Sequence, residues 1–289
     1  MIILKSREEI ERMRQAGRIV VRAHQVARSL LRPGTTTREL ADAVERVLRS
    51  EGAEAVFRER GGRRAFPAAC CVSVNEEVTH GVPGDRQLRA GDLVSLDVGC
   101  RWQGWCSDAA WTYSVGPADA ESDALLQTGR KLLQRAIELL GDPEVGTWRD
   151  VVTRLENVVR ARHLRLVEGF PGHGIGRELH EDPQVPLSVG GAGDRAGFFQ
   201  LRPGLVFTIE PILTNGNALT RVGPDGWSVV TADGRPAAHF EWTVAITDSG
   251  PDVLTAGLTG EPERICPPGR GKSREDGRSS VEKSGRDCL

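Results

Sequence analysis

Two segments of the chain share one pattern, and this pattern restricts the fold more than any other feature of the sequence. Gly91-Asp-Leu-Val-Ser-Leu-Asp97 and Gly204-Leu-Val-Phe-Thr-Ile-Glu210 each consist of a glycine, an apolar strand and a carboxylate at the same interval. Each follows a similar tripeptide, which is His80-Gly-Val82 before the first segment and His173-Gly-Ile175 before the second. The parallel order predicts two halves related by duplication. Short matches of this kind also arise by chance, so other features have to support the prediction.

Helical and strand patterns alternate along the chain in the manner of a mixed α+β domain. Capping boxes at Ser6–Glu9 and Thr36–Glu39 each predict the start of a helix. Helical spacing returns at 122–140 and 148–162, whereas short apolar runs divided by Gly and Pro predict strands over 72–115. Further strand-like runs are GLVFTIEPIL and HFEWTVAIT.

Composition limits the location and the partners. The 38 lysines and arginines nearly balance the 40 aspartates and glutamates, so the totals indicate neither a specific nucleic-acid partner nor an anionic membrane. No apolar run reaches the length of a membrane span, and the first residues turn charged too early for a secretory leader. Six cysteines without any CxxC pair fit a reducing cytoplasm. The last segment is poor in apolar residues, which predicts a folded domain over 1–259 and a disordered, solvated tail over 260–289.

Asp97 and Asp108 are the first candidates for chemistry. If LVSLDV and WCSDAA form a hairpin that turns around Trp102-Gln103, residues whose numbers sum to 205 lie opposite each other. Asp97 then faces Asp108 directly, and two ionised carboxylates at about 4 Å repel each other by roughly 4 kcal/mol in an effective dielectric of about 20. A bound cation would remove this repulsion. A slipped register, or a second aspartate that faces solvent, would explain the pair equally well.

Three further residues could complete a metal site. Glu210 ends an apolar strand and Glu241 lies between Phe240 and Trp242, and carboxylates in such runs are rarely buried without a partner. Glycines on both sides of His173 argue against a helix and let the backbone pass close to a bulky object, such as a metal centre or a peptide. For each residue alone, an exposed position on an edge strand or in a glycine-rich loop remains the simpler alternative.

The chain resembles the type I methionine aminopeptidases, which belong to the pita-bread metalloenzymes. The resemblance covers roughly residues 4 to 258 and is carried by five blocks in the same order and spacing: SVNEEVTHGVP (73–83), GDLVSLDVG followed by SDAA (91–110), GHGIGRELHEDPQV (172–185), FTIEP (207–211) and HFEWTVAIT (239–247). It implies an α+β fold in which two pseudo-symmetric halves build a curved antiparallel sheet with helices on the outer face.

The same resemblance implies a site with two adjacent divalent metals. Their ligands would be Asp97, Asp108, His173, Glu210 and Glu241. This oxygen-rich set with a single imidazole suits Fe²⁺, Mn²⁺ or Co²⁺, and two dications can lower the pKa of a shared water to near neutrality. Glu210 would also move the proton, and His80 and His180 would donate hydrogen bonds to the substrate.

The implied methionine pocket is formed by Phe66, Cys71, Leu179 and Trp227. The segment 57–65, FRERGGRRA, departs from the family's usual aromatic segment, and its two adjacent arginines could alter the rim of the pocket. The implied substrates are nascent polypeptides whose initiator methionine precedes a small residue. The enzyme is expected in the cytoplasm as a monomer, with transient ribosome association as a further expectation.

Several relatives of this fold are alternatives. Proline-specific peptidases usually carry a large N-terminal domain, and His80 comes too early for one. The second methionine aminopeptidase class inserts a helical segment between the positions of His180 and Glu210, where only thirty residues lie here. A shifted specificity and a catalytically inactive binding or adaptor protein of the same fold also remain open, although such adaptors are expected to have lost ligands.

Overall fold

The computed structural model describes residues 1–59, 65–189 and 198–258. In these residues four α-helices cover the predicted segments, although α3 begins slightly before the predicted position 122: α1 (Arg7–Ser29), α2 (Thr37–Ser50), α3 (Ala120–Leu140) and α4 (Trp148–Arg160). Both predicted capping boxes are present, since the side chains of Ser6 and Thr36 accept hydrogen bonds from the backbone of Glu9 and Glu39. The predicted tail, 260–289, lies outside the described residues.

The strands pair only in antiparallel fashion in the described part of the chain. They are β1 (Glu54–Ala55), β2 (Cys71–Val74), β3 (Glu77–Thr79), β4 (Leu93–Trp102), β5 (Trp105–Ser114), β6 (Arg165–Leu166), β7 (Gly172–Gly174), β8 (Glu181–Val185), β9 (Val206–Ile209), β10 (Ile212–Thr214), β11 (Thr220–Val222), β12 (Val229–Thr231), β13 (Ala237–His239), β14 (Trp242–Thr247) and β15 (Gly250–Val253). A short 3₁₀ helix covers Val56–Glu59.

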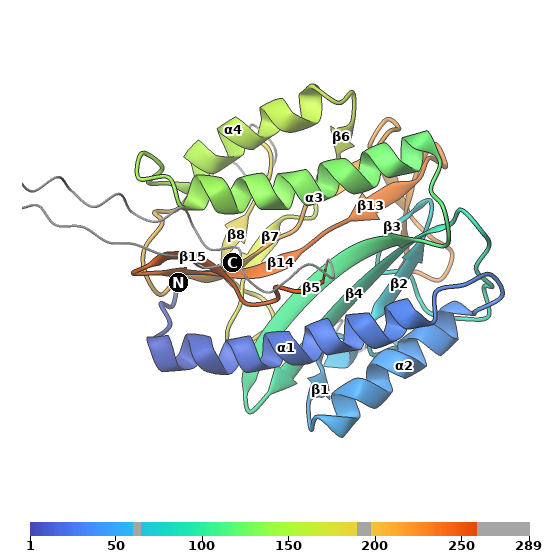
Figure 1. Cartoon of the computed structure of the whole chain (residues 1–289), viewed down its shortest axis with the longest axis horizontal. Helices are drawn as coiled ribbons and strands as arrows, with labels where there is room; N and C mark the ends of the chain where they lie inside the picture. The colour runs from blue at the N-terminus through green and yellow to red at the C-terminus, as the bar shows by residue number, and fades with distance from the viewer. Residues whose placement is uncertain (60–64, 190–197, 259–289) are drawn as a thin grey trace, which may run out of the picture.

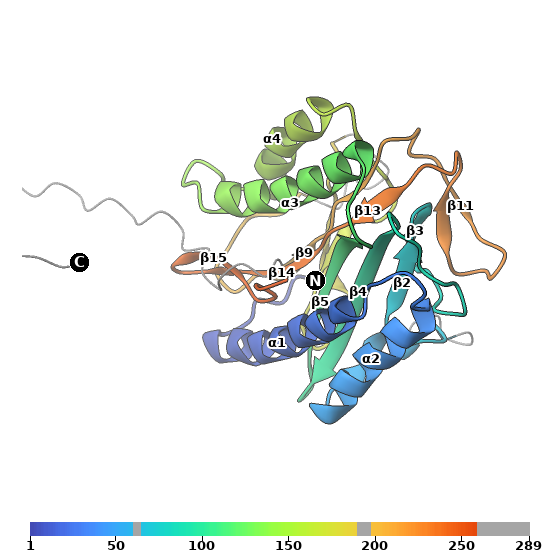
Figure 2. The same cartoon turned by 45° about the vertical axis from the view of Figure 1, so that its right-hand side comes forward.

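Two of the sheets carry the site, and two smaller ones extend them. The first large sheet has the order β1-β4-β2 with β5 paired to β4, and the second has the order β15-β14-β9-β7-β8. The smaller sheets are β13-β10-β6 and β11-β12-β3. When the molecule is turned, β11 is seen at the opposite end from β15 (Figure 2).

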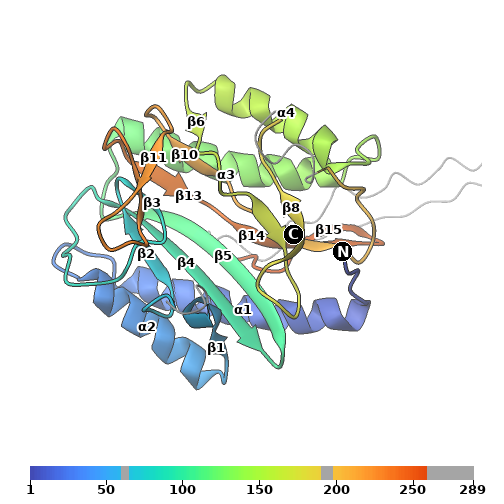
Figure 3. The ribbon, with the colours of Figure 1, turned by 180° about the vertical axis from the view of Figure 1, so that it is seen from behind.

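The helices lie on one face of the strands. Helix α1 packs on α2, β4 and β5, while α3 packs on α4, β10 and β13 (Figure 1). Seen from behind, the strands are in front and the helix pairs lie beyond them (Figure 3). The prediction of an α+β pita-bread fold with helices on the outer face is therefore confirmed. No helix in the described part of the chain combines the length and apolar character needed to cross a membrane.

The predicted duplication is visible in the backbone. Gly91 and Gly204 both adopt left-handed conformations, with φ of 89° and 91°, and each lies just before a strand, β4 or β9. The amide of Gly91 donates to the carbonyl of Val115 and that of Gly204 donates to the carbonyl of Ile246, each at 2.8 Å. Each glycine thus ties the start of one strand, β4 or β9, to the end of its antiparallel partner, β5 or β14.

The repeat extends further toward the N-terminus than the sequence analysis recognised. Gln87-Leu-Arg-Ala-Gly91 matches Gln200-Leu-Arg-Pro-Gly204, and each glutamine forms an isolated β-bridge with the residue that caps a helix. These caps are Thr36 of α2 and Thr147 of α4, and both belong to capping boxes. Each half of the molecule therefore ties its second helix to the segment just before β4 or β9 by the same device.

The turn of the β4–β5 hairpin lies one residue later than predicted, so the predicted pairing of the two strands was wrong by two residues. The turn is formed by Gln103 and Gly104, whose φ values of 49° and 77° suit a two-residue type I′ turn. Asp97 consequently lies opposite Ala110, and Asp108 lies opposite Gly99. Because the shift keeps the alternation of faces, the two aspartates still project from the same face, as diagonal rather than direct neighbours.

Candidate metal centre

All five predicted ligands line one cavity of about 310 Å³. Asp97 and Asp108 come from neighbouring strands β4 and β5, and His173 comes from β7. Glu210 directly follows β9, and Glu241 directly precedes β14. In the duplicated pattern, Asp97 and Glu210 follow their glycines at the same interval. The two halves therefore contribute equivalent carboxylates to one cavity.

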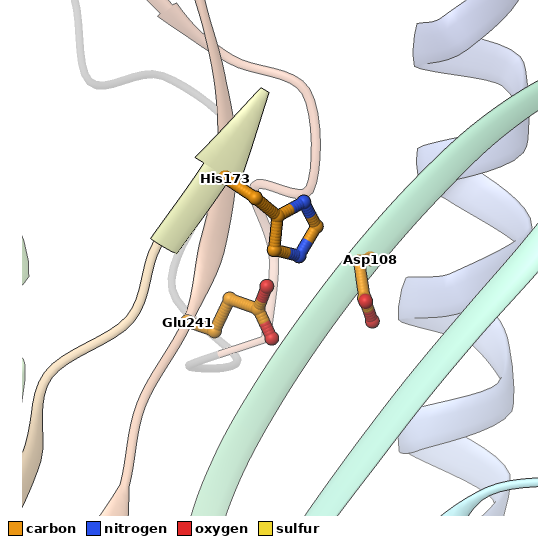
Figure 4. A group of neighbouring side chains, drawn as sticks. All are labelled: Asp108, His173 and Glu241. Carbon is orange, nitrogen blue, oxygen red and sulfur yellow. The ribbon is translucent and has the colours of Figure 1, made fainter. Parts of the chain in front are cut away.

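Asp108, His173 and Glu241 form the tightest group. One potential ligand atom from each lies within 4.8 Å of the other two, and the three side chains point toward one another (Figure 4). Asp108 and Glu241 are 3% and 2% exposed, so water solvates neither carboxylate freely. Such burial favours a compensating cation. Asp97 and Glu210 lie outside this group but line the same cavity.

Hydrogen bonds orient the ring of His173. Its Nδ1 lies 3.0 Å from the carbonyl oxygen of Gly174, which can only accept, so Nδ1 carries the proton in the neutral ring. The lone pair is then on Nε2, which lies 3.7 Å from Oε1 of Glu210. This is the tautomer that a metal-binding histidine needs, with its second nitrogen fixed by a backbone carbonyl.

Thr208 couples His173 to Glu210. The backbone amide of His173 donates to Oγ1 of Thr208 at 3.0 Å, and Oγ1 donates to Oε1 of Glu210 at 2.9 Å. Thr208 is a functional residue that was not predicted from the sequence. Its place in the FTIEP block, two positions before the carboxylate, does not distinguish it from other strand threonines.

The glycines around His173 serve the sheet rather than a ligand. A Cβ atom at Gly172 would clash with the carbonyl oxygen of Thr208, and one at Gly174 would clash with that of Asp182. Strand β7 can therefore lie between β8 and β9 only because glycines flank the histidine. The prediction that these glycines allow close approach to a metal or a peptide was wrong, since neighbouring backbone fills the space.

Contacts between β5 and β14 join the two halves at the site. Oγ1 of Thr243 donates to the carbonyl oxygen of Asp108 at 2.7 Å and accepts from the amide of Asp108 at 3.1 Å. The amide of Glu241 donates to the carbonyl of Ala110 at 2.7 Å. The distance between the Asp108 and Glu241 side chains is thus set by direct backbone contacts across the junction.

The two predicted substrate-facing histidines line the same cavity. His80 has a left-handed backbone with φ of 55°, a conformation that costs energy in a residue other than glycine and that occurs often at functional sites. The His180 side chain is exposed, and its ring centroid lies 4.2 Å from that of His173 at a steep angle.

His239 is a site residue that the sequence analysis missed. It is 3% exposed and lines the cavity, and its Nε2 lies 4.0 Å from Oε2 of Glu210. The pKa of His239 is lowered to about 3, mainly by burial and to a smaller extent by the nearby His80, so the ring is neutral. It begins the HFEWTVAIT block, two residues before Glu241 and separated from it by Phe240. That proximity to a candidate ligand could have drawn attention to it.

The residues predicted to form the methionine pocket gather in one hydrophobic cluster: Phe66, Cys71, Leu179 and Trp227. The rings of Phe66 and Trp227 pack edge to face with centroids 5.5 Å apart. Cys71 lies directly opposite Asp97 across β2 and β4, so the cluster adjoins the candidate ligands. None of the four lines the 310 Å³ cavity itself. The two arginines expected at the rim, Arg63 and Arg64, lie outside the described residues.

Comparisons with known proteins agree with this geometry. A family model described as metallopeptidase family M24 matches residues 11–248. The chain is 38% identical over 256 residues to methionine aminopeptidase 1 of Bacillus subtilis, covering 88% of this chain and 99% of the relative. It is 41% identical over 261 residues to methionine aminopeptidase 1 of Mycobacterium tuberculosis, covering 88% and 94%. A crystal structure of methionine aminopeptidase from Thermotoga maritima matches with a TM-score of 0.81 at 37% identity, covering 88% and 99%.

The chain therefore belongs to metallopeptidase family M24. Within that family, the similarity to methionine aminopeptidases over nearly their whole length confirms the resemblance recognised in the sequence. The donor set agrees with a metallopeptidase, because hard carboxylate oxygens and one correctly oriented imidazole suit divalent cations.

Proposed function

We propose that this protein is a metal-dependent aminopeptidase that removes the initiator methionine from nascent chains when the second residue is small. The observation that carries the proposal is the convergence of Asp108, His173 and Glu241 within 4.8 Å, in the cavity that Asp97 and Glu210 also line. The relatives named methionine aminopeptidase share 35–41% identity with this chain over most of their length, which supports the substrate.

Two divalent ions fit the charge of this site. Four carboxylates and one neutral imidazole supply four negative charges, which two dications balance. The donors suit Fe²⁺, Mn²⁺ or Co²⁺. When bound, the ions would supply a water nucleophile near neutral pH, polarise the scissile carbonyl and hold the free α-amine of the substrate.

The protein groups around the cavity divide the remaining work. Glu210 would take and return the proton at Oε2, because Thr208 holds Oε1 through a hydrogen bond at 2.9 Å. His80 and His180 would donate hydrogen bonds to the peptide and to the oxyanion that develops on its carbonyl. The apolar cluster of Phe66, Cys71, Leu179 and Trp227 would take up the methionine side chain.

The cellular setting follows from the proposed substrate. Nascent N-termini are made in the cytoplasm, so the enzyme would act there as a monomer and contact ribosomes only transiently. The near balance of positive and negative side chains is consistent with the absence of a specific nucleic-acid partner.

Turnover of Met-Gly-X peptides by metal-reconstituted protein tests the proposal. Asp97→Asn and Glu210→Gln should each lower kcat/KM by about a hundredfold or more while circular dichroism and melting remain close to wild type. Asp85→Asn, at a site where the side chain is 91% exposed, is the matched control and should leave turnover unchanged. A wild-type protein that folds without metal and releases no methionine would instead indicate a binding module of the same fold.

A further inference from the structure

A charged pair at the base of the turn that carries His180 stands out among the buried polar groups. The turn connects β7 to β8, and Gly174 pairs with Glu181 across it. Oε1 of Glu181 accepts hydrogen bonds from the amides of Arg177 at 2.7 Å and Glu178 at 3.2 Å. A single carboxylate oxygen thus closes the turn whose last residue is His180.

Lys5 holds the other oxygen of this carboxylate. Its Nζ lies 2.5 Å from Oε2 of Glu181 and donates to the carbonyl of Ile3 at 2.9 Å. The side chains of Lys5 and Glu181 are only 2% and 10% exposed, so solvent screens the attraction weakly. Gly176 leaves room for both, because a Cβ there would lie 2.5 Å from Oε1 of Glu181 and 2.6 Å from Cε of Lys5.

The backbone around this pair contacts two of the strands that carry candidate ligands. The amide of Lys5 donates to the carbonyl of Gly204 at 2.7 Å, just before β9, which leads to Glu210. On the other side of the turn, the amide of Cys106 on β5 donates to the carbonyl of Gly176 at 2.7 Å. These two hydrogen bonds therefore fix the turn relative to β9, which is followed by Glu210, and to β5, which contains Asp108.

We propose that Glu181 is a positioning residue for His180: its Oε1 atom closes the turn that presents the His180 ring to the substrate, and Lys5 balances the buried charge of the carboxylate. This inference rests on the proposed function of His180. Neither member of the pair is among the residues that line the cavity, so its effect on turnover is indirect. A displacement of about 1 Å at a substrate-facing group can cost up to a hundredfold in rate.

Two double variants separate the turn from general stability. Lys5→Met/Glu181→Met removes both charges and the acceptor for the two amides. Lys5→Met/Glu181→Gln also removes both charges but keeps an oxygen at the Oε1 position. Replacing both members of a buried pair avoids leaving one charge alone, so both variants should fold. Arg38→Met/Asp85→Asn removes an exposed pair and serves as the control.

The expected result is a difference between the two double variants. Lys5→Met/Glu181→Met should lose about tenfold to a hundredfold in kcat while keeping its metal content. The amides of Arg177 and Glu178 should exchange hydrogen about tenfold faster than in wild type. Lys5→Met/Glu181→Gln and the control should stay within about threefold of wild type in both measurements.

Three outcomes would overturn the proposal. One is wild-type kcat and unchanged amide exchange in Lys5→Met/Glu181→Met. A second is a loss of kcat of about tenfold in Lys5→Met/Glu181→Gln while the amides of Arg177 and Glu178 stay protected from exchange. This result would overturn the proposal even if Lys5→Met/Glu181→Met does not fold. The third is metal loss in either folded variant. Wild-type turnover of His180→Ala would refute the proposed role of His180 itself, whereas amide exchange reports on the turn regardless of that role.

Discussion

Thr208 lies between two of the predicted ligands, and its single hydroxyl serves both of them. It accepts from the backbone of His173 and donates to Glu210, so neither ligand can shift without the other. The ring of His173 is fixed separately, by the hydrogen bond from Nδ1 to the carbonyl of Gly174. Two independent contacts thus prepare this side of the cavity before any ion binds.

Replacing His180 by alanine separates substrate binding from metal binding. His180 is exposed at the cavity, whereas His173 has its second nitrogen fixed by a backbone carbonyl. His180→Ala should therefore lower kcat by about a hundredfold while the protein keeps its metal content. Elemental analysis beside steady-state kinetics checks this. Loss of metal from the variant would mean that the roles assigned to His173 and His180 are reversed.

The sequence identified the candidate ligands but not their supporting residues. Asp97, Asp108 and Glu241 are detectable because a carboxylate within an apolar strand is unusual. Thr208 carries no such signal, because threonine is common in strands and its role depends on which strand lies beside it. His239 was missed for a related reason: it comes near Glu210 because β13 pairs with β10, which places His239 opposite Ile212, and no local pattern reveals this pairing.

At the level of elements, the β4–β5 hairpin shows how turn chemistry controls the geometry of the site. A turn formed by Gln103 and Gly104 requires positive φ at both positions, which glycine accepts readily and glutamine less so. The sequence signal was therefore weak, and the turn was predicted one residue too early. The prediction that Asp97 and Asp108 lie on the same face of the sheet was still correct, because the pairing shifted by two residues and only an odd shift changes the face.

Helix α3 approaches the strand that precedes Glu241 so closely that only glycine fits at the contact. A Cβ atom at Gly129 would overlap with the buried ring of Phe240. Gly129→Ala should lower the free energy of unfolding, because overpacking costs about 1–3 kcal/mol and the helix propensity of alanine returns at most about 1 kcal/mol. Urea denaturation measures the change, and metal affinity should fall with it because Phe240 adjoins Glu241.

Gly146 provides the matched control for that substitution. A Cβ atom at Gly146 has open space around it and the backbone is not left-handed. Gly146→Ala should therefore leave stability and metal affinity near wild type. Equal losses in the two variants would show that the contact between α3 and Phe240 is not responsible.

On the scale of the whole molecule, His24 links stability to pH. It lies buried on α1, where Nε2 donates to the carbonyl of Ala109 at 3.0 Å and Nδ1 accepts from the hydroxyl of Tyr113 at 3.3 Å. Burial lowers the pKa of His24 from 6.5 to about 4. The unfolded chain then binds an extra proton between these values, so stability is full above about pH 6.5 and falls as the pH drops toward about 4.

Substitution of this histidine tests the linkage. The contribution of His24 to the loss between about pH 6.5 and 4 should reach about 3 kcal/mol, and His24→Gln should remove it. Urea denaturation of wild type and variant across this pH range, with metal chelated, measures how steeply the free energy of unfolding of each protein changes with pH. Parallel curves for the two proteins would assign the acid sensitivity to other groups.

Most of the global architecture was accessible from the sequence because its signals are local. Capping boxes and helical spacing located α1 to α4, and the repeated glycine–strand–carboxylate pattern indicated two halves. The curvature and the division into separate sheets were not accessible in this way. They depend on breaks such as Glu210-Pro211 and Phe240-Glu241, where strands β9 and β14 leave their neighbours β10 and β13.

The matching turns at Gly91 and Gly204 suggest how such a cavity could originate. A half-length ancestor with one turn, one strand and one acid could have paired with a copy of itself about a twofold axis, placing two identical acids on either side of that axis. Fusion of the two genes would then have freed each copy to diverge. One copy could keep its histidine for the ion, as His173 is assigned here, while the other, carrying His80, turned to the peptide.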